Sequence, residues 1–386
     1  MIKTIKVMLL PNNKQKTKLF ECVGAARFAY NWALGYEKAN HEAENSFISH
    51  YELRRIFTEL KKQSKYTWLN DYSNNITKQA IKDACAAYQN FFRGIAGFPK
   101  FKSKRKSRPS FYADTAKISF TSTHVKLEKL TTSRKKNKQK FNYVKLAESN
   151  RIPVNVKYSN PRITFDGLNW WISVGIDCEE SQEKPTNQGI GIDIGIKDLA
   201  ICSDGNVYPN INKTEKIRKI KKKQRRLQRR VSKKYLKNKE EGCFCKTRNI
   251  VKSERNLLKA NHRLTNIRHN YLHSVTSEII NRKPKFIVLD DLNVTGMMKN
   301  KYLSRVVQEQ CFYEFYRQIE YKCHWHNIEL VIADRYYPSS KMCSCCGNIK
   351  NDLKLSDRIY HCSECGLTID RDFQASVNLM NYGLTA

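Results

Sequence analysis

The chain has 386 residues and carries 71 Lys and Arg against 36 Asp and Glu, a formal net charge of +35 at pH 7. This length suggests two or three domains with ample core, and so large a positive charge is easiest to explain if a polyanion, nucleic acid above all, is the usual partner. No apolar run approaches the roughly 20 residues that a membrane-spanning helix needs, and the apolar patch near the N-terminus is too short for a signal peptide, so the sequence predicts a cytoplasmic protein without a membrane partner.

The N-terminal region begins with a strand pattern and continues as helices. Residues 2–10 alternate apolar and polar side chains, as a half-buried strand does, and Pro11 ends the pattern. Apolar side chains then recur at spacings of three and four within residues 18–39 and again within 76–94, which predicts two long helices. Asn75 is the expected N-cap of the second helix.

A basic stretch with interspersed aromatic residues follows the helices. Phe98, Phe101 and Phe111 lie among or beside its cations. Cations suit phosphate contacts, and aromatic rings can stack on bases, although core packing is the more common use of a phenylalanine. The candidate nucleic-acid-binding residues of this stretch are Lys100, Lys102, Lys104, Arg105, Lys106 and Arg108.

Short β-rich runs occupy the next part of the chain, in the order KISF, HVKLEKL, YVKLA, IPVNVKY, RITFDG and WWISVGID. Their spacing and the turn residues between them predict a small antiparallel barrel. The strand at residues 2–10 is expected to belong to it, with the helices inserted. The polar stretch at residues 181–188 is predicted to be a linker.

A strongly basic helix pair is predicted further along the chain. Between Lys213 and Lys239 there are 15 Lys or Arg and a single acid, Glu215. An apolar stripe nevertheless persists on this helix and on its partner, so one side is expected to pack and the other to face an anion. The alternative is an ordinary solvated helix face. The candidate phosphate-binding residues here are Arg225, Arg226, Arg229 and Arg230.

Four of the thirteen cysteines form two tight pairs near the C-terminus. Cys343 and Cys346 are followed after fifteen residues by Cys362 and Cys365, and a glycine follows each pair. Four thiolates at this spacing predict a closed tetrahedral Zn²⁺ site, which is structural because it leaves no open position. The alternative is four free thiols in a loop.

Three aspartates lie at the ends of apolar segments or within them. Asp193 interrupts GIGIDIGI, Asp290 ends FIVL, and Asp372 begins a predicted helix after the last cysteine pair. Burying an unpaired carboxylate is costly, so each should face a cavity or a cation. Converging carboxylates suit Mg²⁺, and two such ions can cleave a phosphodiester. The alternative is that these aspartates cap helices or turns.

Several motifs together point to a family. The second half of the chain contains, in this order, GIDIGIKDLA, IVLDDLNVTGM, YYPSSKMCSCCG and CSECGLTIDRDFQASVN, and the first half contains CVGAARFAYNWAL and PKFKSK. In order and spacing these segments resemble the TnpB (OrfB-type) proteins of insertion-sequence transposons. That family is related to the compact type V CRISPR effector nucleases.

The resemblance implies an α/β multidomain fold. An RNase H-like (RuvC) nuclease domain would carry a zinc ribbon that binds target nucleic acid, and an N-terminal wedge β-barrel would carry an inserted helical recognition domain. The implied ranges are 1–12 for the first wedge strand, 13–97 for the recognition domain, 98–182 for the rest of the wedge barrel, 183–386 for the nuclease domain, 213–281 for its basic helix pair and 338–369 for its zinc ribbon.

The resemblance also implies an activity. Members of the family bind a guide RNA encoded at the transposon end, pair it with double-stranded DNA beside a short adjacent motif, and cut the DNA. The chain is therefore expected to be a Mg²⁺-dependent RNA-guided DNA endonuclease, with two Mg²⁺ and a structural Zn²⁺. It is expected to act as a monomer near the nucleoid of a bacterium or archaeon.

The family's first and last acids correspond to Asp193 and Asp372. Asp370 lies two residues before Asp372 and would point elsewhere on a helix. At the middle position the family usually has Glu followed by Asp, whereas this chain has Asp290 followed by Asp291. Asp290 is thus the expected third metal ligand, with a side chain one methylene shorter. A misplacement near 1 Å can cost about 100-fold in rate.

Two other functions remain open. The family includes nuclease-dead relatives that bind DNA as guided repressors, and an RNase H-like site can also join strands, as a transposase does. An acid at all three positions and four zinc cysteines favour an active nuclease.

Overall fold

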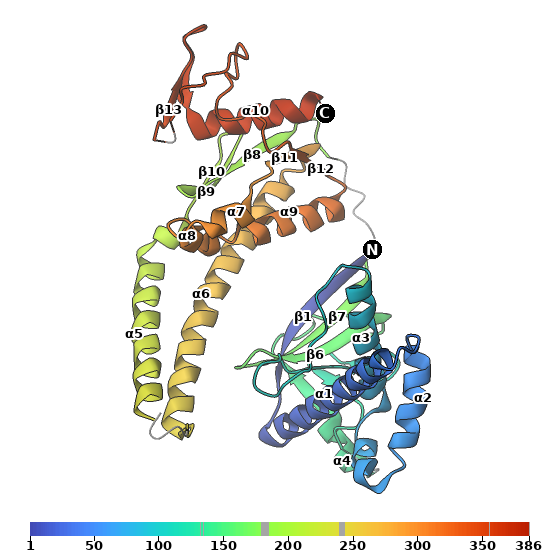
Figure 1. Cartoon of the computed structure of the whole chain (residues 1–386). Helices are drawn as coiled ribbons and strands as arrows, with labels where there is room; N and C mark the ends of the chain where they lie inside the picture. The colour runs from blue at the N-terminus through green and yellow to red at the C-terminus, as the bar shows by residue number, and fades with distance from the viewer. Residues whose placement is uncertain (132, 134, 179–184, 239–243, 355, 386) are drawn as a thin grey trace. The chain divides into compact units, whose positions relative to one another are not determined.

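The computed structural model describes residues 1–385 except 132, 134, 179–184, 239–243 and 355. The chain folds into two units, Met1–Cys178 and Glu179–Ala386, each with its own core. The expected linker at residues 181–188 falls partly outside the described residues, as does the expected boundary between residues 182 and 183. Both units combine helices with a sheet, so the predicted mixed α/β class is confirmed (Figure 1).

The first unit is built on an antiparallel sheet. Among its described residues seven strands pair in the order β2-β6-β7-β1-β5-β4-β3. β1 lies inside the sheet, between β7 and β5, and its exposed and less exposed positions alternate, as the sequence pattern predicts. The strands are β1 (Ile2–Leu10), β2 (Ser110–Tyr112), β3 (Ser119–Phe120), β4 (His124–Lys126), β5 (Tyr143–Leu146), β6 (Tyr158–Phe165) and β7 (Trp170–Asp177).

One expected strand of this sheet is wrong. Residues 152–157, which read as β-rich, form an irregular segment. Asn155 has a left-handed φ of 60°, and Pro153 has no N–H to offer a neighbouring strand. The pairings of the described residues do not join β2 to β3, so closure into a barrel stays a prediction.

Helices accompany this sheet within the first unit. They are α1 (Asn13–Glu42), α2 (His50–Leu60), η1 (Ser64–Asp71), α3 (Asn74–Phe92), α4 (Lys136–Gln139) and η2 (Lys140–Asn142). Buried alanines such as Ala29 and Ala84 let α1 and α3 approach closely. The expected cap at Asn75 is wrong by two residues, because Ser73 is the N-cap of α3 and its Oγ accepts from the backbone N–H of Asn75 at 3.2 Å.

The second unit is built on a mixed sheet. In its described part five strands run in the order β10-β9-β8-β11-β12. β8, β11 and β12 are parallel, and β9 and β10 are antiparallel to their neighbours. The strands are β8 (Ile190–Ile194), β9 (Asp198–Cys202), β10 (Val207–Pro209), β11 (Phe286–Asp290) and β12 (Glu329–Ala333).

Helices cover both faces of this sheet (Figure 1). α6 (Arg248–Asn281) and α9 (Phe312–His326) pack against side chains such as Ile192 and Leu289. On the other face, α10 (Arg371–Thr385) packs against Phe286 and Val288. Gly191 marks the closest approach of α10, because a Cβ there would overlap the helix backbone at Ser376 and Met380. The smaller helices are η3 (Ile211–Lys213), α7 (Val294–Lys299) and α8 (Ser304–Gln310).

The basic helix pair consists of α5 (Glu215–Lys237) and α6, and their apolar stripes meet. Ile217 and Ile220 of α5 pack with Leu264 of α6. The second unit also contains a small hairpin, β13 (Ile359–His361) with β14 (Thr368–Asp370), which leads directly into α10.

Candidate functional site

The three predicted acids come from three elements of the second unit. Leu289 of β11 pairs with Ile192 of β8, and both strands run in the same direction. Asp290 and Asp193 are the next residues, so they lie side by side at the carboxyl ends of adjacent parallel strands. Asp193 shares a sheet face with Gly191, two residues before it, and this is the face that α10 covers. Asp372 lies in the first turn of α10.

Asp193 is the most strongly perturbed acid of the three. Burial is the main cause that raises its pKa to about 7, and Asp372 and Asp290 add to the effect. Arg371 acts in the opposite direction. Two neighbouring carboxylates therefore oppose the ionisation of Asp193. A cation bound among them would favour the ionised form and lower this pKa.

Asp290 and Asp291 have different surroundings. Burial raises the pKa of Asp290, as does the neighbouring Asp291. Asp291 is half-exposed and forms an ion pair with Arg335, whose Nη2 lies 2.5 Å from its Oδ2. The cation beside Asp291 already compensates its charge. This contrast favours Asp290 as the acid that serves the site.

Asp370 and Asp372 also differ in their roles. Asp370 Oδ1 accepts the backbone N–H groups of Asp372 at 3.0 Å and Phe373 at 3.1 Å, so Asp370 caps the start of α10. Asp372 Oδ1 accepts from Arg371 Nη2 at 3.0 Å, and its Oδ2 lies 3.6 Å from Nη1 of Arg358. The sequence motifs did not point to these two arginines, which pair with the carboxylate of Asp372.

The spacing of the acids bears on how they would hold Mg²⁺. In the part of the chain that the structure describes, the four cysteines form the only group of three or more His, Cys, Asp or Glu side chains whose ligand atoms all lie within 4.8 Å of one another. The three aspartates are more widely spaced. An all-oxygen donor set of this kind fits a hard ion.

The four predicted zinc cysteines come together. Cys343 Sγ lies 3.5 Å from Cys365 Sγ, and Cys346 Sγ lies 3.5 Å from Cys362 Sγ. The glycine after each pair has a positive φ, 76° at residue 347 and 72° at residue 366, and donates its N–H to the carbonyl of the first cysteine. The cluster can hold a tetrahedral metal ion.

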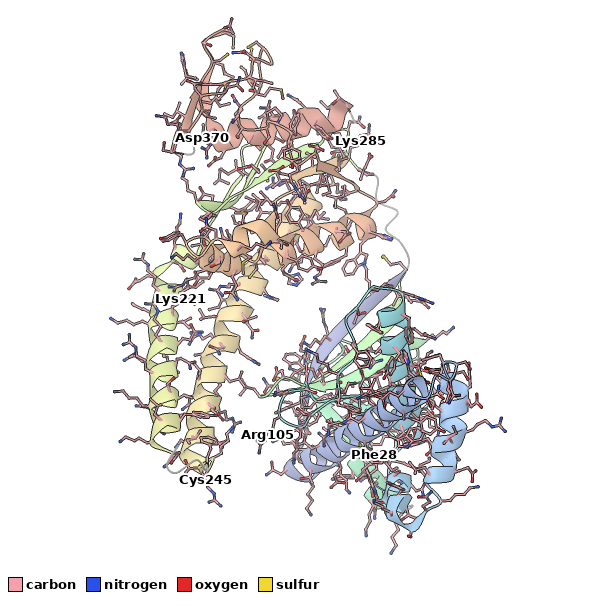
Figure 2. The ribbon with its side chains drawn as sticks, in the orientation of Figure 1. Phe28, Arg105, Lys221, Cys245, Lys285 and Asp370 are labelled. Atoms are coloured by element: carbon pink, nitrogen blue, oxygen red, sulfur yellow. The ribbon has the colours of Figure 1, made fainter. Side chains whose placement is uncertain are left out.

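The predicted basic residues of the first unit lie on the segment that follows α3. All of them are exposed except Lys102, which is partly buried. The Nζ of Lys102 lies 3.6 Å from the centroid of the Tyr30 ring, and its backbone exchanges two hydrogen bonds of 2.8 Å with Asn31. Burial lowers the pKa of Lys102. Lys102 therefore holds the segment against α1. Its neighbours, such as Arg105, face solvent (Figure 2).

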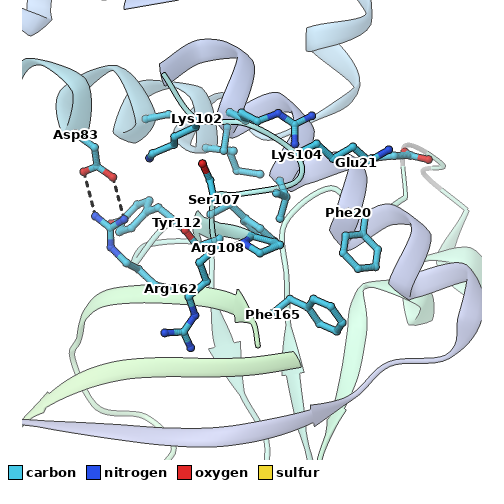
Figure 3. A pocket seen from close by; sticks show the side chains of 18 of the residues that line it. Phe20, Glu21, Asp83, Lys102, Lys104, Ser107, Arg108, Tyr112, Arg162 and Phe165 are labelled. Atoms are coloured by element: carbon cyan, nitrogen blue, oxygen red, sulfur yellow. Dashed lines mark hydrogen bonds and ion pairs between the residues drawn. The ribbon is translucent and has the colours of Figure 1, made fainter. Parts of the chain in front are cut away.

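This segment borders a cavity of about 650 Å³ (Figure 3). Phe20 and Phe165 line one part of it, with ring centroids 5.1 Å apart. Lys104 and Arg108 line another part. An ion pair forms part of the wall, where Arg162 donates to both carboxylate oxygens of Asp83 at 2.9 and 3.1 Å. The cavity thus combines apolar rings with cations, a combination typical of nucleic-acid contacts.

The predicted arginines of α5 are exposed. Arg225, Arg226, Arg229 and Arg230 all lie away from the stripe that packs on α6. Nearer the N-terminal end of α5, Lys221 is not available in the same way, because its Nζ forms an ion pair with Oε2 of Glu309 at 2.5 Å. No described helix has the length and apolar character needed to cross a membrane.

Three family models match separate parts of the chain. "Helix-turn-helix domain" (HTH_OrfB_IS605) matches residues 1–46, "Probable transposase" (OrfB_IS605) matches 156–301, and "Cas12f1-like, TNB domain" matches 312–379. The last range contains the cysteine cluster and Asp372.

Curated relatives match over the whole chain. One from Streptomyces pristinaespiralis, "Putative RNA-guided DNA endonuclease", is 28% identical over 100% of this chain and 90% of its own length. Another from Escherichia coli (strain K12), "Putative RNA-guided DNA endonuclease InsQ", is 28% identical over 99% of this chain and 92% of its own length.

The fold also matches a solved structure. In the cryo-EM structure of a Cas12f1-sgRNA-target DNA complex, the protein chain aligns with a TM-score of 0.55 at 13% identity, over 99% of each chain. The fold is thus mixed α/β and matches that of the Cas12f1 chain, and the cysteine cluster lies within the range that matches the TNB zinc-ribbon-type domain. The chain is therefore similar over its whole length to proteins named as RNA-guided DNA endonucleases, and it matches OrfB_IS605 family models over residues 1–46 and 156–301.

Proposed function

We propose that this protein is an RNA-guided DNA endonuclease that cuts DNA with a metal-dependent RuvC site. The names of its full-length relatives support the guided activity. The observation that carries the site is the convergence of Asp193, Asp290 and Asp372 from β8, β11 and α10, with the pKa of Asp193 raised to about 7 by burial and by the other two carboxylates. A mixed sheet with acids at the ends of adjacent parallel strands fits an RNase H-like domain.

The residues of the site would divide the work as follows. Asp193 and Asp290 would ligate Mg²⁺ from the sheet, and Asp372 from the helix above it. Mg²⁺ held there would activate water as the nucleophile and stabilise the leaving oxygen. Arg371 and Arg358 contact Asp372. They would hold its carboxylate in place and offer positive charge to the scissile phosphate.

The zinc ribbon would support the site from one side. We assign Zn²⁺ to Cys343, Cys346, Cys362 and Cys365, because four thiolates without an open position suit a structural ion. The turn of the β13-β14 hairpin carries Cys362 and Cys365, and the hairpin continues into α10. The folded ribbon would therefore help to fix the start of the helix that bears Asp372.

The nucleic-acid contacts would come from both units. In the first unit, taken as a wedge barrel with an inserted recognition domain, the segment from Lys100 to Arg108 and the cavity beside it would hold DNA next to the guide-paired region. In the second unit, the exposed arginines of α5 would bind the backbone of the guide RNA and target heteroduplex, whose sequence is read by base pairing.

One experiment separates this function from the two alternatives. The protein is purified from cells that also express the flanking transposon end, bound RNA is sequenced, and the complex is incubated with Mg²⁺ and a matching plasmid. Cutting supports the nuclease, guided binding without cutting supports a repressor, and strand joining supports a transposase. If no RNA co-purifies, both guided functions fail. Asp193→Ala should abolish cutting and leave guided binding intact.

A further inference from the structure

A tyrosine on α9 contacts the turn that follows the middle acid. Tyr316 donates a hydrogen bond from its hydroxyl to the backbone carbonyl of Asp290, and the same hydroxyl oxygen accepts from the backbone N–H of Leu292 at 3.5 Å. The turn is tight, because the N–H of Leu292 also bonds to the carbonyl of Asp290 at 3.0 Å. One hydroxyl thus connects both ends of the turn that contains Asp291.

The helix that carries Tyr316 is well packed in the core. α9 is anchored in the core of the second unit by fully buried side chains such as Phe315 and Ile319, on either side of Tyr316 in the sequence. Its ring packs partly buried against this core.

The turn has a second restraint on its outer side. Arg335, just after β12, holds the carboxylate of Asp291 at 2.5 Å. The backbone at Asp290 is therefore held from α9, and the adjacent side chain from the neighbouring strand.

We propose that Tyr316 is a positioning residue for the metal site: its hydroxyl sets the backbone of the Asp290–Leu292 turn so that the short Asp290 side chain reaches the ion. This inference rests on the proposed function. An aspartate has one fewer rotatable bond than a glutamate, so its carboxylate can correct a displaced backbone less. The position of that backbone then matters more, and misplacement near 1 Å can cost about 100-fold in rate.

The test compares two tyrosines of one helix. Tyr316→Phe removes the hydroxyl and keeps the ring, and Tyr313→Phe is the matched control because the Tyr313 side chain is 75% exposed. Metal binding is measured without cleavage, as the rise in thermal midpoint that MnCl₂ produces in the full-length protein. Asp193→Asn gives the baseline for ions bound elsewhere. Guided cleavage is measured in parallel across a range of Mg²⁺ concentrations.

We expect Tyr316→Phe to need about tenfold more Mn²⁺ than the wild type for the same rise in thermal midpoint. The loss of one well-placed hydrogen bond is large enough to account for a change of this size. The cleavage deficit should shrink at high Mg²⁺, and adding Asp290→Glu to the Tyr316→Phe variant should restore part of its activity. Tyr313→Phe should match the wild type. Unchanged metal dependence in Tyr316→Phe would overturn the proposal, and so would an equal loss at every metal concentration.

The two readouts separate this inference from the proposed function. If the wild type binds Mn²⁺ but does not cut guided DNA, the proposed function fails and the metal titration still decides the role of Tyr316. If the wild type cuts and Tyr316→Phe behaves identically in both assays, the inference fails alone.

Discussion

The replacement Gly191→Ala tests how closely the site depends on the packing of α10. Gly191 lies in β8, two residues before Asp193, and a Cβ there would sit 3.0 Å from the carbonyl carbon of Leu379 and closer still to Ser376 O and Met380 N. These are backbone atoms, so the helix itself must move. Such overpacking typically costs about 1–3 kcal/mol of stability.

The movement should affect cutting more than stability. α10 carries Asp372 in its first turn, so a shift of the helix by roughly 1 Å separates Asp372 from Asp193, and a misplacement of that size costs about 100-fold in rate. The assay is guided plasmid cleavage at a temperature well below the thermal midpoint of the variant, together with that midpoint.

Gly189→Ala is the matched control. A Cβ at Gly189, just before β8, would first meet the side-chain ring of Phe286, whereas one at Gly191 meets the backbone of α10 itself, so Gly189→Ala should displace the helix less. Both variants should lose stability, and only Gly191→Ala should lose most of its cutting rate. Equal cutting by the two variants would refute the reasoning that links β8, α10 and the site.

Three further predictions concern other parts of the molecule. Removal of zinc with a chelator should release about one Zn²⁺ per chain and lower both cutting and the thermal midpoint, because the ribbon leads into α10; retained cutting by zinc-free protein would contradict this. Replacing the arginines at 225, 226, 229 and 230 with Gln should reduce the slope of log affinity against log salt by about 0.9 for each phosphate that the protein no longer neutralises, whereas an unchanged slope would exclude them from the interface. Lys322 is 7% exposed, and burial lowers its pKa from 10.5 to about 8, so the folded protein loses the Lys322 proton at a lower pH than the unfolded chain does. As pH rises from 8 to 10.5, the free energy of unfolding of the wild type should therefore increase by up to about 3 kcal/mol relative to that of Lys322→Met. A difference between the two proteins that does not change with pH in denaturant unfolding would contradict the lowered pKa.

The sequence predicts the elements of the site well, because local pattern determines them. β8 and β11 follow from apolar runs that only a buried strand explains, and an aspartate inside or at the end of such a run has few structural uses. Spacing alone predicted the cysteine cluster. Even the choice between Asp370 and Asp372 follows from helix geometry, since the first residue caps α10 and the second lies in its first turn.

Contacts between distant segments could not be predicted in this way. Tyr316 reads as one of many aromatic residues on a helix, and Arg335 as an ordinary basic residue after a strand. Their contacts with Asp290 and Asp291 exist only because α9 and β12 pack beside β11. The irregular segment at 152–157 was wrongly predicted as a strand because its Ile and Val residues are typical of strands. The sequence does not show that Asn155 adopts a left-handed conformation, and a single proline did not exclude a strand.

The most direct test of the central claim uses the acidic neighbours within the two motifs. Guided, Mg²⁺-dependent plasmid cleavage is measured for Asp193→Asn, Asp290→Asn and Asp372→Asn, and for the adjacent controls Asp291→Asn and Asp370→Asn. The controls are mild, because the side-chain oxygen of an Asn at 291 can still accept the hydrogen bond from Arg335, and Asn caps a helix about as well as Asp. The three-acid site predicts that the first three variants bind guided DNA without cutting it and that both controls still cut. Cutting by Asp193→Asn, or a loss at Asp291 as large as that at Asp290, would contradict it.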